Sequence, residues 1–343
     1  MSSVTVDNIP RDRVLVNADH VDRVSALDFP HQYYNEENTF DIENFKKNVQ
    51  IKLIAGNDKK LEFDFIGLSE AFANTIRRIM IAEVPTLAIE YVRIYNNNGI
   101  IQDEVLAHRL GLIPIKADPR KFQYKRSNSE TTQNTIIFNL NVECKVDNQR
   151  HVEGEGVPII NGNVYSNSIK WQPFHEQNET FKDSPIDVVY PDILITKMVP
   201  DQIIYADLLA HKGQGQDHIK FSPVATAFYR LMPEIIIQKP IEGELAHKFQ
   251  KCFPSGVIGI ENKNGVDTAV VANPRLDRVT REVLRHEEFQ DSVKLTRIRN
   301  HIIFNVETVG NMTPSEVFEE SLKILKNKAR RYLVKLEKLN QTD

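Results

Sequence analysis

The stretch NTIRRIMIAEVPTLAIEYVRIYNNNGIIQDEVLAHRLGLIPIKAD, from Asn74 to Asp118, decides the fold predicted for this chain. It begins inside a helix, because apolar residues recur there at spacings of three and four. This apolar stripe consists of Leu68, Phe72, Ile76, Ile79 and Met80. Ser69 is the expected N-cap, and Pro85 ends the helix. Residues 86–95 then have strand character, and the NNNG run at 96–99 is typical of a turn.

Two elements flank this helix and strand. A short helix is expected from Asp103 to Leu110, with Asp103 as its cap and Gly111 closing it. Upstream, the runs VQIKLI and KLEFDFIGL alternate between apolar and polar residues and are split by turn residues at 56–58. They predict a β-hairpin with one buried face.

The C-terminal part predicts a strand followed by a long helix. The strand is HIIFNVETV at 301–309, and the helix has Thr313 as its cap and Pro314 at its first position. Apolar residues then form a heptad seam, which consists of Phe318, Leu322, Leu325, Ala329, Tyr332, Leu336 and Leu339. A helix of about 25 residues is about 37 Å long, more than a small domain needs for its own core. Part of the seam is therefore expected to face another chain, although an internal core helix would show the same periodicity.

Composition restricts the classes of function. The 43 Lys and Arg residues against 47 Asp and Glu give a net charge of -4, which argues against broad contact with phosphate backbones. The basic clusters at 121–126 and 326–331 are too small to establish a nucleic-acid patch. Two cysteines, Cys144 and Cys252, cannot supply a disulfide framework or a four-cysteine metal site. With no signal peptide or membrane span apparent, an intracellular protein is expected.

No motif for catalysis stands out. The sequence lacks clustered carboxylates for two metals, a phosphate loop, an HExxH pair and a GxSxG elbow. Gly213 and Gly215 in HKGQGQDH lack a third glycine, so a plain loop at 211–218 competes with phosphate binding. His108 and Arg109 could do acid-base work, or they could be surface pairs or partner contacts. We expect no catalytic residue, no cofactor and no metal.

Arg77 and Arg78 are adjacent on the first helix. At about 100° per residue they cannot both lie on the apolar stripe. One interpretation is a solvated face, and the other is recognition of carboxylates on a partner, which suits the forked guanidinium.

The residues from Asn74 to Asp118 closely resemble the signature of the RNA polymerase alpha family, which includes bacterial alpha, the archaeal D subunit and the eukaryotic alpha-like subunits. Two further blocks resemble the family in the same order: DHIKFSPVATAFYRL at 217–231 and HIIFNVETVGNMTPSEVFEESLKIL at 301–325. Within the family, the chain most resembles the larger alpha-like subunit shared by eukaryotic RNA polymerases I and III.

The resemblance implies an α+β fold with an alpha-like discontinuous dimerisation domain, a mixed sheet plus two long helices, into which a mostly-β domain is inserted. The implied division is an N-terminal arm at 1–47, the dimerisation domain at 48–88 and 296–343, and the insert at 89–295. Residues 251–286, within a segment at 241–290, resemble the ferredoxin-like insert of some archaeal members. Only Cys252 remains of its cysteines, so neither metal nor an iron–sulfur cluster is expected.

The implied function is that of a non-catalytic assembly platform of RNA polymerases I and III, in the nucleolus and nucleoplasm. Such a subunit pairs with a smaller alpha-like subunit, docks the largest and second-largest subunits, and meets DNA only through the complex. The implied dimerisation residues are Phe72, Ile76, Ile79, Met80, Phe318, Leu322, Leu325, Ala329, Tyr332 and Leu336. The implied docking residues are Arg77, Arg78, His108 and Arg109. Alternatives are an alpha-like subunit of a single polymerase, a stand-alone nucleic-acid-binding protein and a metalloenzyme.

Overall fold

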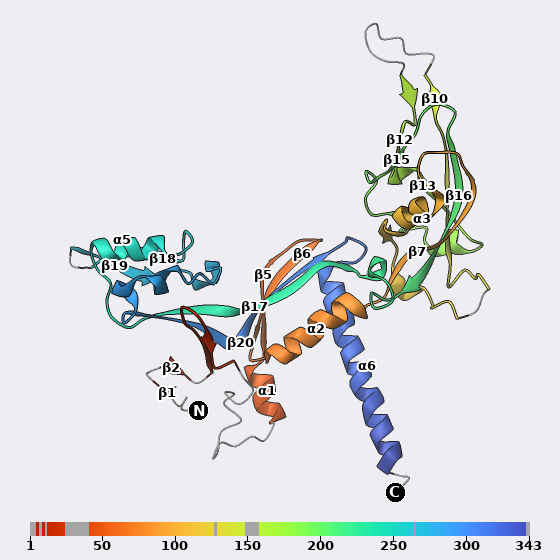
Figure 1. Cartoon of the computed structure of the whole chain (residues 1–343). Helices are drawn as coiled ribbons and strands as arrows, with labels where there is room; N and C mark the ends of the chain where they lie inside the picture. The colour runs from red at the N-terminus through yellow and green to blue at the C-terminus, as the bar shows by residue number, and fades with distance from the viewer. Residues whose placement is uncertain are drawn as a thin grey trace. The chain divides into compact units, whose positions relative to one another are not determined.

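The computed structural model (Figure 1) describes residues 5–6, 9–10, 12–24, 41–126, 129–147, 158–263 and 265–340. The chain forms two compact units, each assembled from segments distant in sequence. The first comprises residues 1–55, 62–74 and 228–305, and the second comprises 56–61, 75–227 and 306–343. These units have other bounds than the predicted domains. The predicted division into arm, dimerisation domain and insert stays a prediction.

A six-stranded sheet carries most of the first unit. Its order is β4-β3-β20-β6-β5, and β17 also pairs with β20. The strands are β3 (Arg13–Val16), β4 (Val21–Asp22), β5 (Gln50–Gly56), β6 (Lys60–Ile66), β17 (Val224–Ile237) and β20 (Val293–Thr308). Its core includes Phe63, Phe65 and Phe304, whose ring centroids lie 5.0–5.8 Å apart.

The predicted hairpin is present as β5 and β6, but only β6 has a buried face. The side chain of Asn57 closes the turn, since its Oδ1 accepts hydrogen bonds from the amides of Lys59 (2.9 Å) and Lys60 (2.8 Å). All of β5 is exposed, whereas Phe63 to Phe65 of β6 are buried. β5 ends the strand order of the sheet. A strand at the edge of a sheet can remain exposed. The alternating sequence pattern does not show that β5 lies at the edge.

The predicted N-terminal arm at 1–47 contains regular elements. β3 pairs antiparallel with β20, matching Val16 to Leu295 and Val14 to Arg297, and both valines are buried. Such a four-residue strand is too short to show a period. The remaining elements here are β1 (Thr5–Val6), β2 (Ile9–Pro10) and α1 (Ile42–Asn48), which the side chain of Asp41 caps through the amide of Glu43 at 2.9 Å.

The segment at 241–290 packs around a hydrophobic core inside the first unit that also includes Val16 and Leu295 of the sheet. Its regular elements are α5 (Glu244–Lys251), the antiparallel hairpin β18 (Ile258–Lys263) and β19 (Val266–Val271), and 3₁₀ turns at 274–276, 282–285 and 287–289. The rings of Phe249, Phe253 and Phe289 pack together there, with centroids 5.1 and 5.4 Å from Phe249. Cys252 is buried beside them, and its Sγ donates to the carbonyl of Lys248 at 3.4 Å.

The second unit is organised around a four-stranded antiparallel sheet of order β13-β9-β16-β7. These strands are β7 (Thr86–Asn97), β9 (Ile136–Glu143), β13 (Ile169–Gln172) and β16 (Ile203–Gly213). α3 (Asp103–Gly111) buries Leu106 and Leu110 in the same core as Phe138 and Leu208 of the sheet.

Short elements complete the second unit. The two-stranded pairs are β8 (Ile115–Lys116) with β14 (Asp187–Val188), β10 (Lys145–Val146) with β11 (Ile159–Ile160), and β12 (Asn163–Tyr165) with β15 (Leu194–Lys197). The helix α4 (Gln177–Thr180) and 3₁₀ turns at 119–121, 166–168 and 219–221 also belong to this unit. No helix among the described residues is both long and apolar enough to cross a membrane.

Several strands run further than the sequence indicated. β7 takes in Asn96 and Asn97 of the expected turn, β16 takes in the first three residues of the loop expected at 211–218, and β20 begins at Val293 instead of residue 301. These extensions are set by pairing with neighbouring strands, such as Gly213 with Thr86. The local sequence does not show which strands pair or over what length.

Candidate interaction surfaces

The helix α6 (Pro314–Asn340, 27 residues) begins as predicted. The amide and hydroxyl of Thr313 donate to Oε2 of Glu316 at 3.0 and 2.9 Å, and the amide of Glu316 donates back to Oγ1 of Thr313 at 3.4 Å. This reciprocal arrangement is a capping box, with Pro314 in the first turn where no amide donor is needed.

The apolar seam of α6 changes from covered to exposed along the helix. Val317 and Ser321 are buried, and Phe318, Leu322 and Leu325 are half-buried. From Ala329 onward every residue to Asn340 is exposed. The large apolar side chains of this part are Tyr332 (62% exposed), Leu333 (59%), Val334 (51%), Leu336 (56%) and Leu339 (62%). We call residues 329–340 the exposed end of α6, the last part of the helix before the C-terminal end drawn in Figure 1.

The stripe on α2 (Glu70–Ala82) is mostly covered by this chain itself. Ile76, Ile79 and Met80 are at most 2% exposed, and Phe72 is half-buried. The three buried side chains belong to the core of this chain, and their assignment to the dimer surface stays a prediction. A periodic stripe identifies an apolar face but not the chain that covers it.

The C-terminal end of α2 is held by residues from two other segments. The Nζ of Lys328 on α6 forms an ion pair with the carboxylate of Glu83. The amide of Gln216 donates to the carbonyl of Ala82 at 2.9 Å. A Cβ at Gly215 would lie only 2.1 Å from the carbonyl oxygen of Ile81, and one at Gly213 would lie 2.6 Å from the Phe221 ring. Close packing therefore explains both glycines without a phosphate.

The four predicted docking residues all lie in the second unit, but they differ in their surroundings. Arg78 and His108 are exposed, while Arg77 is half-buried. Arg109 braces its own chain, because its Nε donates to the carbonyl of Ile195 at 2.9 Å and its Nη2 donates to that of Leu194 at 2.8 Å. Two of its guanidinium nitrogens are thus already hydrogen-bonded to the backbone of β15.

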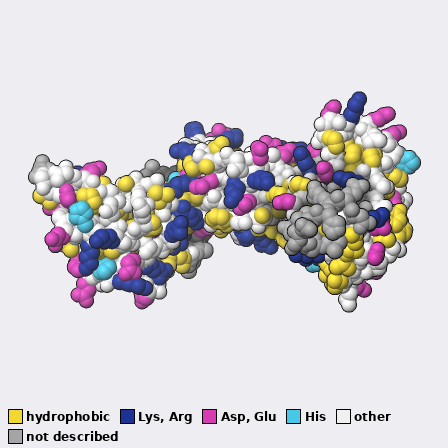
Figure 2. All heavy atoms as spheres, turned by 90° about the horizontal axis from the view of Figure 1, so that it is seen from above, with side chains coloured by type: hydrophobic (Ala, Val, Ile, Leu, Met, Phe, Trp, Pro, Cys, Tyr) yellow, Lys and Arg dark blue, Asp and Glu magenta, His cyan; other side chains and the backbone are white. Residues whose placement is uncertain are grey.

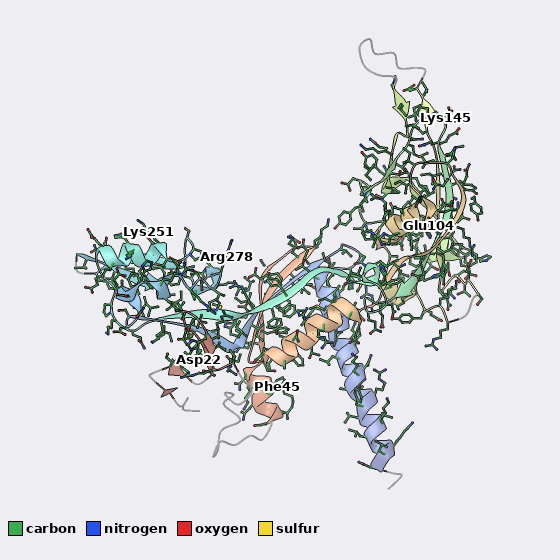
Figure 3. The ribbon with its side chains drawn as sticks, viewed as in Figure 1. Asp22, Phe45, Glu104, Lys145, Lys251 and Arg278 are labelled. Atoms are coloured by element: carbon green, nitrogen blue, oxygen red, sulfur yellow. The ribbon has the colours of Figure 1, made fainter. Side chains whose placement is uncertain are left out.

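The start of α3 also differs from expectation. Its N-cap is Gln102, which makes no side-chain cap bond, and Oδ1 of Asp103 instead accepts from Nδ2 of Asn97 at 2.7 Å. Asp103 and Glu104 lie in the first turn, where Figure 3 marks Glu104, and His108 and Arg109 lie in the last. This order of charges complements the helix dipole, a structural role that needs no acid-base chemistry.

Two features escaped the sequence reasoning. On β5, Ile51, Leu53 and Ile54 are exposed large apolar residues. Within the first unit, Nη1 of Arg275 lies 2.7 and 2.9 Å from the two carboxylate oxygens of buried Asp64. The same carboxylate accepts from Nε2 of His301 at 3.0 Å when that nitrogen carries the proton. These partners are 211 and 237 residues from Asp64 in sequence, so no local signal could have joined them.

The cysteine positions give no sign of a metal centre. Burial raises the pKa of the Cys252 thiol, and burial also raises that of Cys144. Both effects disfavour the thiolate form that binds metals. Among the residues that the structure describes, no three His, Cys, Asp or Glu side chains are grouped to hold an ion. That the chain binds no metal stays a prediction.

Comparison with known proteins tests the family resemblance. The family model described as the RNA polymerase Rpb3/Rpb11 dimerisation domain matches residues 62–329. The Saccharomyces cerevisiae protein named DNA-directed RNA polymerases I and III subunit RPAC1 is 46% identical over 322 residues, covering 92% of this chain and 95% of the relative. The Homo sapiens protein of that name is 43% identical over 334 residues, covering 95% and 96%.

An archaeal relative is more distant. DNA-directed RNA polymerase subunit Rpo3 of Pyrococcus horikoshii is 28% identical over 295 residues, covering 85% of this chain and 99% of the relative. The predicted α+β fold, the family and the greater similarity to the subunit shared by polymerases I and III are confirmed. The chain belongs to the RNA polymerase Rpb3/Rpb11 dimerisation domain family.

Proposed function

We propose that this chain is the non-catalytic, alpha-like assembly subunit shared by DNA-directed RNA polymerases I and III. The single observation that carries the proposal is the match along 92–95% of the chain to relatives bearing that name. The exposed end of α6 supports it, because an assembly subunit needs an apolar surface that its own fold leaves open. The chain makes no bond in RNA and instead holds together the enzyme that does.

The partner of the exposed end is a smaller alpha-like subunit. Five large apolar side chains are exposed there, and burying each contributes about 1.5–3 kcal/mol before the entropy costs of association. The interface continues toward the half-buried Phe318, Leu322 and Leu325 and includes Ala329. Phe72 of α2 adds the part of its surface that its own chain leaves exposed, whereas Ile76, Ile79 and Met80 are buried within the chain.

The largest and second-largest subunits dock on the second unit. Arg78, His108 and Arg77 offer charge and hydrogen-bond donors for carboxylates, and the forked guanidinium suits such contacts. Arg109 acts mainly by fixing the backbone of β15. Figure 2 shows Lys and Arg interspersed with Asp and Glu over the face it displays, which suits contact with proteins better than broad contact with DNA. DNA is reached only through the complex.

The proposed assemblies define where the chain works. RNA polymerases I and III act in the nucleus, so the chain is proposed to reside in the nucleolus and the nucleoplasm. There it supports transcription of rRNA, 5S rRNA and tRNA, and so ribosome biogenesis.

Affinity purification of the tagged chain tests the proposal. Recovery of the large subunits of both polymerases, together with a smaller alpha-like chain, is the expected result. Recovery of one polymerase set alone would support a subunit of a single polymerase instead. Salt-sensitive binding of the isolated chain to duplex DNA, without polymerase subunits, would support the nucleic-acid-binding alternative.

A charge on the seam tests the dimer surface. Leu336→Glu is expected to abolish recovery of the smaller alpha-like chain, because it places a carboxylate in an apolar contact. Leu325→Glu should do the same, but Leu325 is half-buried in its own chain and its loss can also weaken the fold. Asn327→Glu, at an exposed residue of the same helix outside the seam, is the control for added negative charge. Normal recovery with Leu336→Glu would contradict the assigned surface.

A further inference from the structure

A concave, cation-lined region lies on the second unit, beside strands β7 and β16. It consists of two hollows that share the side chains of Arg126 and Lys212. The first has a volume of about 750 Å³. Apart from the two shared cations, the described residues around it are aromatic, hydroxyl or amide side chains, without a carboxylate. We call the two hollows together the basic groove.

The second hollow, of about 610 Å³, contains both signs of charge. Two of its three carboxylates already have ion-pair partners: Glu130 lies 2.5 Å from Arg93, and Glu90 lies 2.6 Å from Lys220. What remains to attract a ligand is the positive charge of Lys125, Arg126 and Lys212. It is opposed by Asp217 in the lining and, near Lys212, by Asp118 and Glu320. The groove as a whole therefore favours an anion.

The two lysines of the groove are held in place by their surroundings. The Nζ of Lys125 lies 3.4 Å from Nε2 of His211 and 5.5 Å from the centroid of the Tyr91 ring. The Nζ of Lys212 donates to the carbonyl of Phe122 at 3.0 Å and lies 5.2 Å from the centroid of the Tyr124 ring. Burial, with Lys125 nearby, lowers the pKa of His211 to about 4, so near pH 7 the imidazole is neutral and can accept from Lys125. Ammonium groups fixed in advance lose little entropy on binding a carboxylate.

We propose that the basic groove binds an extended acidic segment of another protein, whose carboxylates contact Lys125, Arg126 and Lys212. The lining of the groove includes none of the residues named for the dimer and docking surfaces, so the contact adds a third class of partner. Recognition is through side chains, because register shifts leave Glu90 and Tyr95 as extra residues on the terminal strand β7. Such irregularities disfavour the addition of another strand.

A single-stranded nucleic acid fits the groove less well. Its bases need open aromatic faces, and Lys125 and Lys212 already lie over Tyr91 and Tyr124. A continuous row of phosphates would also pass Asp217 and the carboxylates of the second hollow, while an acidic peptide can space its charges to avoid them.

The test uses the full chain in complex with its smaller alpha-like partner and a fluorescent peptide in which Glu alternates with Ser. Fluorescence anisotropy at low ionic strength is expected to show saturable binding, which a matched peptide with Gln in place of Glu lacks. Arg126→Gln and Lys125→Gln should each weaken binding about tenfold. Lys170→Gln is the matched control, since Lys170 is exposed on β13, at the other end of the strand order from β7.

Three outcomes would overturn the proposal. The first is unchanged affinity in both groove variants, and the second is equal binding of the Gln peptide. The third is single-stranded RNA that binds more tightly than the acidic peptide and loses affinity in Arg126→Gln, which would assign the groove to nucleic acid. Arg126 is exposed, so its substitution leaves the fold intact and the comparison stays informative.

Discussion

At the scale of single residues, His211 links a buried site to the pH dependence of stability. Burial first, and Lys125 second, lowers its pKa from 6.5 to about 4. Between these values the unfolded chain binds a proton that the folded chain excludes, so the free energy of unfolding falls as pH falls from 6.5 toward 4. The difference bounds this loss at roughly 3 kcal/mol.

His211→Gln should remove most of that pH dependence while keeping an acceptor for Lys125. The measurement is thermal or denaturant unfolding of the heterodimer at neutral pH and near pH 5. A variant whose stability falls as steeply as that of the natural chain would show that other groups dominate. Near neutral pH the two proteins should differ little, because the imidazole is already neutral there.

Gly215 offers a sharper test of packing at the end of α2. A methyl group there would meet the carbonyl oxygen of Ile81 at 2.1 Å, and that oxygen belongs to helix backbone that cannot easily move. Gly215→Ala should cost about 1–3 kcal/mol of unfolding free energy. Gly99→Ala is the control, since the nearest atom is a side-chain oxygen of Asn97 at 3.2 Å. Equal stability of the two variants would contradict the close approach described for Gly215.

At the scale of elements, the start of α6 was predictable from local sequence and burial was not. Thr313 and Pro314 identified the first turn of α6 because capping chemistry is local. The stripe of α2 was also recognised, yet its buried members Ile76 and Met80 were assigned to a partner. The exposed side chains of Leu53 on β5 and Leu336 on α6 could not be told apart from core residues by period alone. Which chain covers an apolar face is a property of tertiary structure.

The capping box of α6 provides a prediction at this scale. Thr313→Ala removes the hydroxyl that bonds with Glu316, and it should lower stability by about 1 kcal/mol. Thr313→Ser keeps a hydroxyl and should retain most of that energy. Hydrogen exchange of the amides in the first turn of α6 gives the local readout. Equal protection in the Ala and Ser variants would mean that the box contributes little.

At the scale of the whole molecule, neither unit is a continuous stretch of sequence, so the order of segments does not show which of them pack together. Residues 62–74 join 228–305 in one unit, while 306–343 join 75–227 in the other. The family resemblance implied a discontinuous domain with other bounds, 48–88 and 296–343, and that division stays a prediction. The ion pair of Arg275 with Asp64 and the basic groove near Lys125 had no motif and depend on segments brought together by folding. They could be found only from the structure.

Folding and assembly should therefore be separable at the exposed end of α6. A chain ending at residue 328 keeps Val317, Ser321 and the ion pair of Lys328 with Glu83, and it loses only exposed residues among those described. Its melting temperature in isolation should match that of the full chain within a few degrees, because no buried residue among those described is removed. Co-expressed with the smaller alpha-like subunit, it should fail to form the heterodimer and so recover neither polymerase. A large drop in melting temperature would show that the exposed end belongs to the core of this chain, and normal assembly would place the dimer contact elsewhere.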